Sequence, residues 1–156
     1  MKKSLDDLFE EARIGPVEYK GFAVHRIVTR KVYKPGQFII RFLKAAPYPI
    51  QGLRINIEPG KLFIEDDVYT RVLLRLDIIT DDVLVRYQPS SKGSEIVFYN
   101  GWMYENEVLH AWFNNSGMLV EEQGNKLILH CSDGYGDYYR EPSFDDLIVE
   151  IDFLND

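Results

Sequence analysis

The sequence contains one cysteine and three histidines, and it lacks both long apolar runs and an excess of positive charge. The single cysteine, Cys131, excludes an internal disulfide. No apolar run approaches the roughly 20 residues that cross a bilayer, and the first residues, MKKSLDDLFEEAR, lack the apolar core of a signal peptide. We therefore expect no membrane partner, and either a cytoplasmic location or a place in an assembled particle.

Catalytic signatures are also missing from the sequence. The chain has no GxSxG, HExxH or CxxC motif and no glycine-rich loop that would cradle a phosphate. His25, His110 and His130 are far apart in the sequence, which counts against a histidine metal site. His130 and Cys131 are adjacent on a predicted strand and point to opposite faces, which counts against a base and nucleophile pair. We expect a protein that is not an enzyme.

The formal net charge is −7, from 18 Lys and Arg against 25 Asp and Glu. Nucleic acid is therefore not expected as a partner, because phosphate binding needs clustered cations. The charge is unevenly spread, since residues 11–50 hold eight basic residues whereas residues 121–156 hold ten acidic ones. Either these segments neutralise each other within one fold, or they contact a charged partner or another copy of the chain, head to tail in a homo-oligomer.

The segment SLDDLFEEARIGP predicts a helix near the amino terminus. Ser4 can cap it, Asp7 occupies the third helical position, and Gly15 and Pro16 end it. An apolar stripe runs along it at helical spacing, formed by Leu5, Leu8, Phe9 and Ala12. So short a helix is marginal alone, so the stripe must pack either on its own sheet or on a neighbouring subunit.

From Pro16 onward, apolar and polar residues alternate at the period of half-buried strands. About ten such runs are separated by turn-forming residues, and this pattern predicts an all-β, antiparallel β-sandwich, jelly-roll-like, with a short amino-terminal α-helix. We expect a single domain over residues 1–156, with the helix in 1–15 and the sandwich in 16–156. The run 21–33 has an uncertain phase, which predicts a β-bulge.

Alternation is strictest near the carboxyl-terminal end of the sequence. In KLILHC the thiol of Cys131 shares a face with Leu127 and Leu129, so we expect it to be buried and inert. In DLIVEIDF one face consists of Leu147, Val149, Ile151 and Phe153. These faces are predicted to belong to the core.

Aromatic residues gather in FYNGWMYENEVLHAWF, residues 98–113, and again in the segment 131–146. The pair Asn100-Gly101 predicts a hairpin turn, next to which Trp102 and Tyr104 should be exposed. The other large rings of the first stretch are expected in the core: Phe98, Trp112 and Phe113. Flat rings beside polar groups suit sugars and peptides. The candidate ligand-binding residues are therefore Trp102, Tyr104, Tyr135, Tyr138 and Tyr139.

The segment CSDGYGDYYREPSFDDLIVEIDF, residues 131–153, concentrates carboxylates in one loop whose only cation is Arg140. Oxygen ligands at this density suit calcium, which takes six to eight of them. The candidate metal ligands are Asp133, Asp137, Asp145 and Asp146, with Glu141 as a possible fifth. The alternative is a solvated acidic turn whose charge is balanced by Arg140 and nearby cations.

This segment resembles the acidic calcium loop of calcium-dependent β-sandwich modules, among them bacterial fucose- and mannose-binding lectins. The matching residues are Asp133 and Asp137, followed by Phe144-Asp145-Asp146-Leu147. The sequence departs from that pattern by inserting residues 138–143 between the acids, with Pro142 where a further Asp is usual. The resemblance implies bound calcium and a carbohydrate ligand.

These observations predict a noncatalytic binding or interaction module, supported by calcium, for a carbohydrate or a protein partner. One alternative is a structural subunit of a larger assembly such as a phage or virus particle, in which the helix and the opposite charges form subunit contacts. Another is an acidic antitoxin or immunity protein that covers a basic partner.

Overall fold

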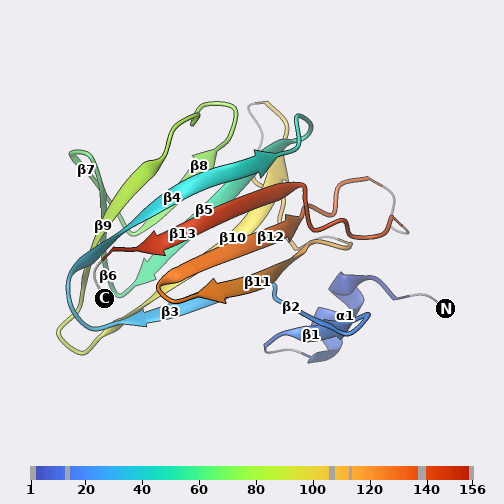
Figure 1. Cartoon of the computed structure of the whole chain (residues 1–156), viewed down its shortest axis with the longest axis horizontal. Coiled ribbons are helices and arrows are strands. Elements are labelled where there is room, and N and C mark those ends of the chain that lie inside the picture. The colour runs from blue at the N-terminus through green and yellow to red at the C-terminus, as the bar shows by residue number, and fades with distance from the viewer. Residues whose placement is uncertain (1–2, 13–14, 106–107, 113, 137–139, 155–156) are drawn as a thin grey trace.

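The computed structural model describes residues 3–12, 15–105, 108–112, 114–136 and 140–154. Two antiparallel sheets pack face to face, and a helix and a small hairpin cover one end of the pair (Figure 1). This arrangement confirms the predicted all-β sandwich with a short amino-terminal helix. The described part of the chain has no helix with the length and apolarity that a membrane span requires.

The first sheet has four strands in the order β3-β10-β5-β8. They are β3 (Val28–Val32), β10 (Ser94–Met103), β5 (Ile50–Glu58) and β8 (Arg71–Arg75). The second sheet has seven strands in the order β11-β12-β13-β4-β9-β6-β7. They are β11 (Gly117–Gln123), β12 (Lys126–Ser132), β13 (Leu147–Phe153), β4 (Gly36–Ala45), β9 (Val83–Pro89), β6 (Gly60–Ile64) and β7 (Asp67–Tyr69).

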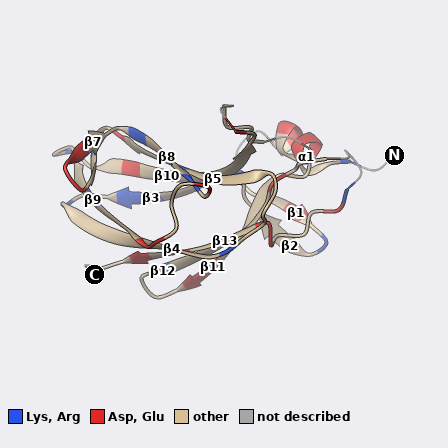
Figure 2. Cartoon of the chain, turned by 90° about the horizontal axis from the view of Figure 1, so that it is seen from above, with Lys and Arg blue, Asp and Glu red and all other residues tan. Residues whose placement is uncertain are grey.

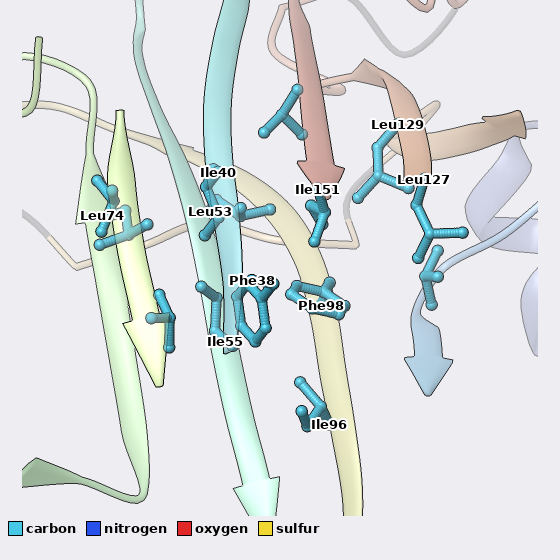
Figure 3. Packing of buried hydrophobic residues seen from close by; sticks show 14 of the residues in the cluster. Phe38, Ile40, Leu53, Ile55, Leu74, Ile96, Phe98, Leu127, Leu129 and Ile151 are labelled. Carbon is cyan, nitrogen blue, oxygen red and sulfur yellow. The ribbon is translucent and has the colours of Figure 1, made fainter. Parts of the chain in front are cut away.

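The core between the sheets is built from the alternating apolar faces of the strands. Phe38 on β4 is fully buried, and its ring lies 5.6 Å from Phe98 on β10 (Figure 3). The ring of Phe153 on β13 is 5.1 Å from Phe38. The predicted inward face of β13 is confirmed, since the four apolar residues of that face, Leu147, Val149, Ile151 and Phe153, are all buried. Cys131 is buried as expected, and burial raises the pKa of its thiol.

The amino-terminal helix α1 (Leu5–Ala12) begins with the predicted cap. Asp7 N donates to Ser4 Oγ over 3.1 Å, and Ser4 N donates to the Asp7 carboxylate over 3.0 Å, which satisfies two amides at the start of the helix. Leu5 and Phe9 form a second apolar cluster with β1 (Val17–Tyr19) and β2 (Phe22–Val24). The stripe therefore packs within the same chain.

Opposite charges meet within the fold because β4, from the basic part of the sequence, is hydrogen-bonded to β13, from the acidic part. Arg41 on β4 lies 2.7 Å from Glu150 on β13, and Lys44 lies 2.9 Å from Asp145. Figure 2 shows acidic and basic residues interspersed over both sheets. The two segments thus neutralise each other in part, which was one of the two predicted arrangements.

Three local predictions are wrong. The run 21–33 contains no continuous strand, because it breaks after β2 and resumes at β3. Asn100 and Gly101 lie within β10 and not at a turn, since their neighbours on β5 continue the ladder through them. Trp112 is 40% exposed, and its ring lies 5.0 Å from that of Tyr99, tilted by 44°, rather than in the core. Phe113 lies outside the described residues.

The docking of α1 can be tested with Leu5→Ala. Because Leu5 is fully buried, the substitution should destabilise the fold by about 2 to 5 kcal/mol in urea unfolding. Glu10→Ala on the exposed side of the same helix is the control, and it should stay within about 0.5 kcal/mol of wild type. Equal effects of the two substitutions would contradict the packing of α1 against its own domain.

Candidate functional site

Buried polar groups are concentrated at one end of the sandwich. Nine polar or charged residues of the described chain are buried, and all of them except Ser94 lie at this end. They are Ser4, Gln51, Asn100, Asn115, Ser116, Ser132, Asp133 and Asp146. We call this set the polar end. Buried polar groups are costly unless they are hydrogen-bonded, so their accumulation sets this end apart from the rest of the fold.

The strand order explains why Asp133 and Asp146 meet there. Asp133 follows β12 and Asp146 precedes β13, and these two strands are antiparallel neighbours in which Cys131 pairs with Leu147. The loop between them must therefore begin and end at one place. Asp133 N donates to Asp146 Oδ2 over 2.9 Å, and Asp146 N donates to the Cys131 carbonyl over 3.0 Å.

Asp133 is only 1% exposed, yet its carboxylate has several partners. It accepts hydrogen bonds from Gln51 Nε2 over 3.0 Å and from Tyr135 N over 2.9 Å. Arg140 lies 3.6 Å from Asp133 Oδ1 and 3.4 Å from Asp146 Oδ1, so one guanidinium faces both acids. Burial raises the pKa of Asp133, and these hydrogen bonds and Arg140 oppose that shift.

The other predicted metal ligands are placed differently. Asp145 is half exposed and pairs with Lys44, whose hydrogen bond lowers the pKa of Asp145. Glu141 interacts with Tyr19 and Lys20. Asp137 lies outside the described residues, as do Tyr138 and Tyr139. Among the residues described, no group of three or more His, Cys, Asp or Glu side chains could hold a metal ion.

Five rings lie together beside the polar end: Tyr48, Trp102, Tyr104, His110 and Tyr135. We call them the aromatic cluster. The ring of Trp102 is at the centre, 4.9 Å from Tyr135, 5.3 Å from Tyr104 and 4.4 Å from His110. Tyr48 completes the group, with its ring 5.7 Å from Tyr135 and 6.1 Å from Tyr104. Tyr48 is 61% exposed and Tyr104 38%, so the cluster forms part of the surface.

Backbone pairing holds the cluster in place. Trp102 on β10 is opposite Gln51 on β5, and on its other side it exchanges two backbone hydrogen bonds with His110. Gly101 permits the return of the chain at His110, because a Cβ at this position would lie 2.6 Å from the His110 carbonyl oxygen. The same Gln51 side chain donates to Asp133, so the aromatic cluster and the polar end share a scaffold.

The hydroxyl groups of the three tyrosines interact with one another. Hydrogen bonding to Tyr135, followed by burial, raises the pKa of Tyr104 to about 12, and the same partner raises the pKa of Tyr48. Two buried polar atoms next to them, Trp102 Nε1 and Gln51 Oε1, have no hydrogen-bond partner among the described residues. The cluster therefore combines ring faces with phenol groups that can both donate and accept.

The structure brings together three of the predicted ligand-binding residues, Trp102, Tyr104 and Tyr135. The sequence did not single out Tyr48, Gln51 and His110 for this cluster. The position of Tyr48 between two prolines, in APYPI, is the one sequence signal of an exposed, conformationally restricted ring. Gln51 gives no signal, because only the register of β5 against β10 places it beside Trp102.

Comparison with models of protein families, with curated proteins and with solved structures finds no match. The geometry of this end of the sandwich is therefore the basis for assigning a function.

Asp133 and Asp145 should respond to pH with opposite signs. The pKa of Asp133 is raised in the folded chain. The contribution of Asp133 to the free energy of unfolding is therefore fully present below its pKa in the unfolded chain, about 3.9, and is lost as the pH rises through its pKa in the folded chain. The lowered pKa of Asp145 means that its contribution is present above the unfolded value and is lost as the pH falls through the folded pKa.

Urea unfolding over a pH series checks this. The stability of wild type minus that of Asp133→Asn should fall as the pH is raised from about 4. The corresponding difference for Asp145→Asn should shrink as the pH is lowered, by a smaller amount because Asp145 is half exposed. If the two differences in unfolding free energy changed with pH in the same direction, the environments assigned to Asp133 and Asp145 would be wrong.

Proposed function

We propose that the protein is a noncatalytic binding module that takes a carbohydrate on the aromatic cluster. The proposal rests on one observation: around Trp102, exposed tyrosine rings lie together and their hydroxyl groups interact with one another. Sugars have apolar C–H faces bordered by hydroxyl groups, so they pack on flat rings and exchange hydrogen bonds at the edges.

The polar end supports this proposal by holding the rings in a fixed arrangement. Tyr135 N is bonded to the buried Asp133 carboxylate, and the Tyr135 carbonyl accepts a hydrogen bond from Arg140 over 2.9 Å. A ring whose backbone is held on both sides loses little conformational entropy when a ligand binds. A peptide with alternating apolar and polar groups would use the same features, and such a protein partner is the other outcome of the binding experiment.

A matched pair of tyrosine substitutions tests the proposal. Tyr48→Ala should weaken binding to a sugar selected on a glycan array by at least about fivefold, or about 1 kcal/mol, because a stacking surface is lost. Tyr33→Ala is the control, since Tyr33 is similarly exposed at 68% and lies far from the cluster. Isothermal titration calorimetry provides the dissociation constants.

Failure of every glycan to bind, or equal weakening by both substitutions, would contradict a carbohydrate site on the aromatic cluster. Binding of a peptide in place of a glycan, with the same dependence on Tyr48, would replace the carbohydrate by a protein partner. Retention of full sugar binding in Tyr48→Ala would move the site away from this cluster.

Calcium support of the acidic loop is a second, separable part of the proposal. Asp133 and Asp146 supply neighbouring carboxylates, and Gln51 adds a buried amide oxygen that accepts no hydrogen bond from the residues described. Calcium would have to displace Arg140, whose distances to the two acids exceed those of strong charge-assisted bonds. The remaining ligands would come from Asp137 and from backbone or water oxygens.

Calcium should raise the melting temperature if it binds here. For a dissociation constant of roughly 0.5 mM, about 5 mM calcium would add about 1.4 kcal/mol, or about 3 to 6 °C for a chain of this length. Calorimetry after chelator treatment measures the shift, which should be smaller with magnesium and absent in Asp146→Asn. If calcium leaves the melting temperature of the wild-type protein unchanged, Arg140 is the cation that neutralises the loop.

A further inference from the structure

A group of cations at the other end of the sandwich lacks acidic partners. Arg30 and Lys31 on β3, Lys34 in the turn to β4, and Lys92 in the turn before β10 form no ion pair within the described chain. By contrast, Arg41, Lys44, Lys126 and Arg140 are all paired with carboxylates. The turn that joins β3 to β4 lies at the opposite end of the long axis from α1 (Figure 1).

Three of these cations, Arg30, Lys31 and Lys34, border a cavity of about 330 Å³ between the two sheets. Among the described residues, no acidic residue lines this cavity. Its apolar surface includes Val32 and Tyr87, which are buried. A hollow bordered by cations, with no carboxylate in its described lining, is a place where an anion can be desolvated against opposite charge.

The guanidinium of Arg30 is held in position by the core. It lies over the ring of Phe153, 4.4 Å from the ring centroid, where the edge of β3 faces the other sheet. The planar fork of Arg30 is thus oriented before any ligand arrives, so that little side-chain entropy is lost on binding. Asn125, whose backbone carbonyl accepts a hydrogen bond from Phe153 N over 3.0 Å, is an uncharged residue in the lining of the same cavity.

The ring of Tyr33 separates this cavity from a second one of about 340 Å³. Tyr33 packs against Gly93, where a Cβ would lie 2.8 Å from the ring. Any side chain at position 93 would therefore displace the ring of Tyr33. The second cavity contains Lys31 and Lys92 but also Glu58 and Glu95. Of these two cavities, the first is the one whose described lining has cations and no carboxylate, as an anion requires.

We propose that the first cavity, bordered by Arg30, Lys31, Lys34 and Tyr33, binds a ligand through a phosphate or sulfate group. The guanidinium of Arg30 and the ammonium group of Lys34 hold the anion, since the Arg fork matches tetrahedral oxyanions and Lys supplies a point charge. Lys31 borders the same cavity from the neighbouring position of β3, but its side chain leaves the opposite face of the strand, where Glu95 is its cross-strand partner. The uncharged remainder of the ligand lies against Tyr33 and the apolar surface of Val32 and Tyr87. This site is separate from the aromatic cluster and does not depend on the proposed carbohydrate site.

Amide chemical shifts of the full chain, followed during titration with inorganic phosphate and with sulfate, test the site. The shifts should change at residues 30–34 and at Asn125, and sodium chloride at matched ionic strength should leave them unchanged, because general screening is not site-specific. Titration with glucose 6-phosphate then distinguishes the free anion from a phosphorylated organic ligand. If glucose 6-phosphate binds more tightly than inorganic phosphate, the apolar surface takes part in recognition. If the two bind equally, the site recognises the anion alone.

The variants compare equal losses of charge at the two ends of the molecule. Lys34→Gln should weaken phosphate binding by about tenfold or more, the loss expected for a hydrogen bond to a charged group. Lys20→Gln is the matched control, since it removes one exposed lysine near α1 and should change binding less than about twofold.

Melting temperatures establish that each variant is folded, and Lys34→Gln lies in an exposed turn where a change of fold is not expected. Absence of shift changes at residues 30–34 in wild type would overturn the proposal. So would shift changes centred on Arg140, or equal weakening by Lys34→Gln and Lys20→Gln.

Discussion

The burial of the Asp133 carboxylate is the constraint on which one end of this protein depends. A buried charge is tolerated only with donors and a counter-charge, and here they come from three separate parts of the chain: Gln51 on β5, the Tyr135 amide and Arg140. Each partner is fixed in turn. Asn115 donates to the Arg140 carbonyl and accepts from Leu5 N, which ties α1 to the same network. The aromatic cluster is positioned by these contacts rather than by its own packing alone.

Those parts of the fold that follow from local pattern could be predicted from the sequence. The alternation in β12 and β13 fixed which side chains are buried, because a strand with one apolar face has one stable orientation. The cap of α1 followed from Ser4 and Asp7. The hairpin turn predicted at Asn100-Gly101 was wrong, because the pairing of β10 with β5 continues through these two residues and outweighs their local preference for a turn. The clustering of Tyr48 with Trp102 depends on register between distant segments, which no local pattern contains.

Charge illustrates the same limit in the opposite direction. The negative total argued against nucleic acid as a partner, yet the folded chain pairs many of its acids internally and leaves Arg30, Lys31 and Lys34 without an ion pair among the described residues. The net charge of the sequence does not show how the fold separates acidic from basic side chains in space. The internal pairing of β4 with β13 likewise weakens the argument from opposite charges for a structural subunit, whereas it leaves unchanged the net charge of −7 on which the antitoxin alternative rests. The two ends of the sandwich thus offer different chemistry, neutral rings at one and cations at the other.

The attachment of α1 also bears on how the chain folds as it is made. The helix is synthesised before the strands described here, but Leu5 N is hydrogen-bonded to Asn115, a residue 110 positions later, and its apolar cluster includes Leu119 and Phe144. Until Phe144 has left the ribosome, the apolar stripe of this helix lacks part of its native contacts. Contacts of such long range close slowly and leave apolar surface exposed in the meantime. A nascent chain of this protein therefore exposes an apolar helix face, of the kind that chaperones bind, from the synthesis of α1 until the segment 115–144 has emerged.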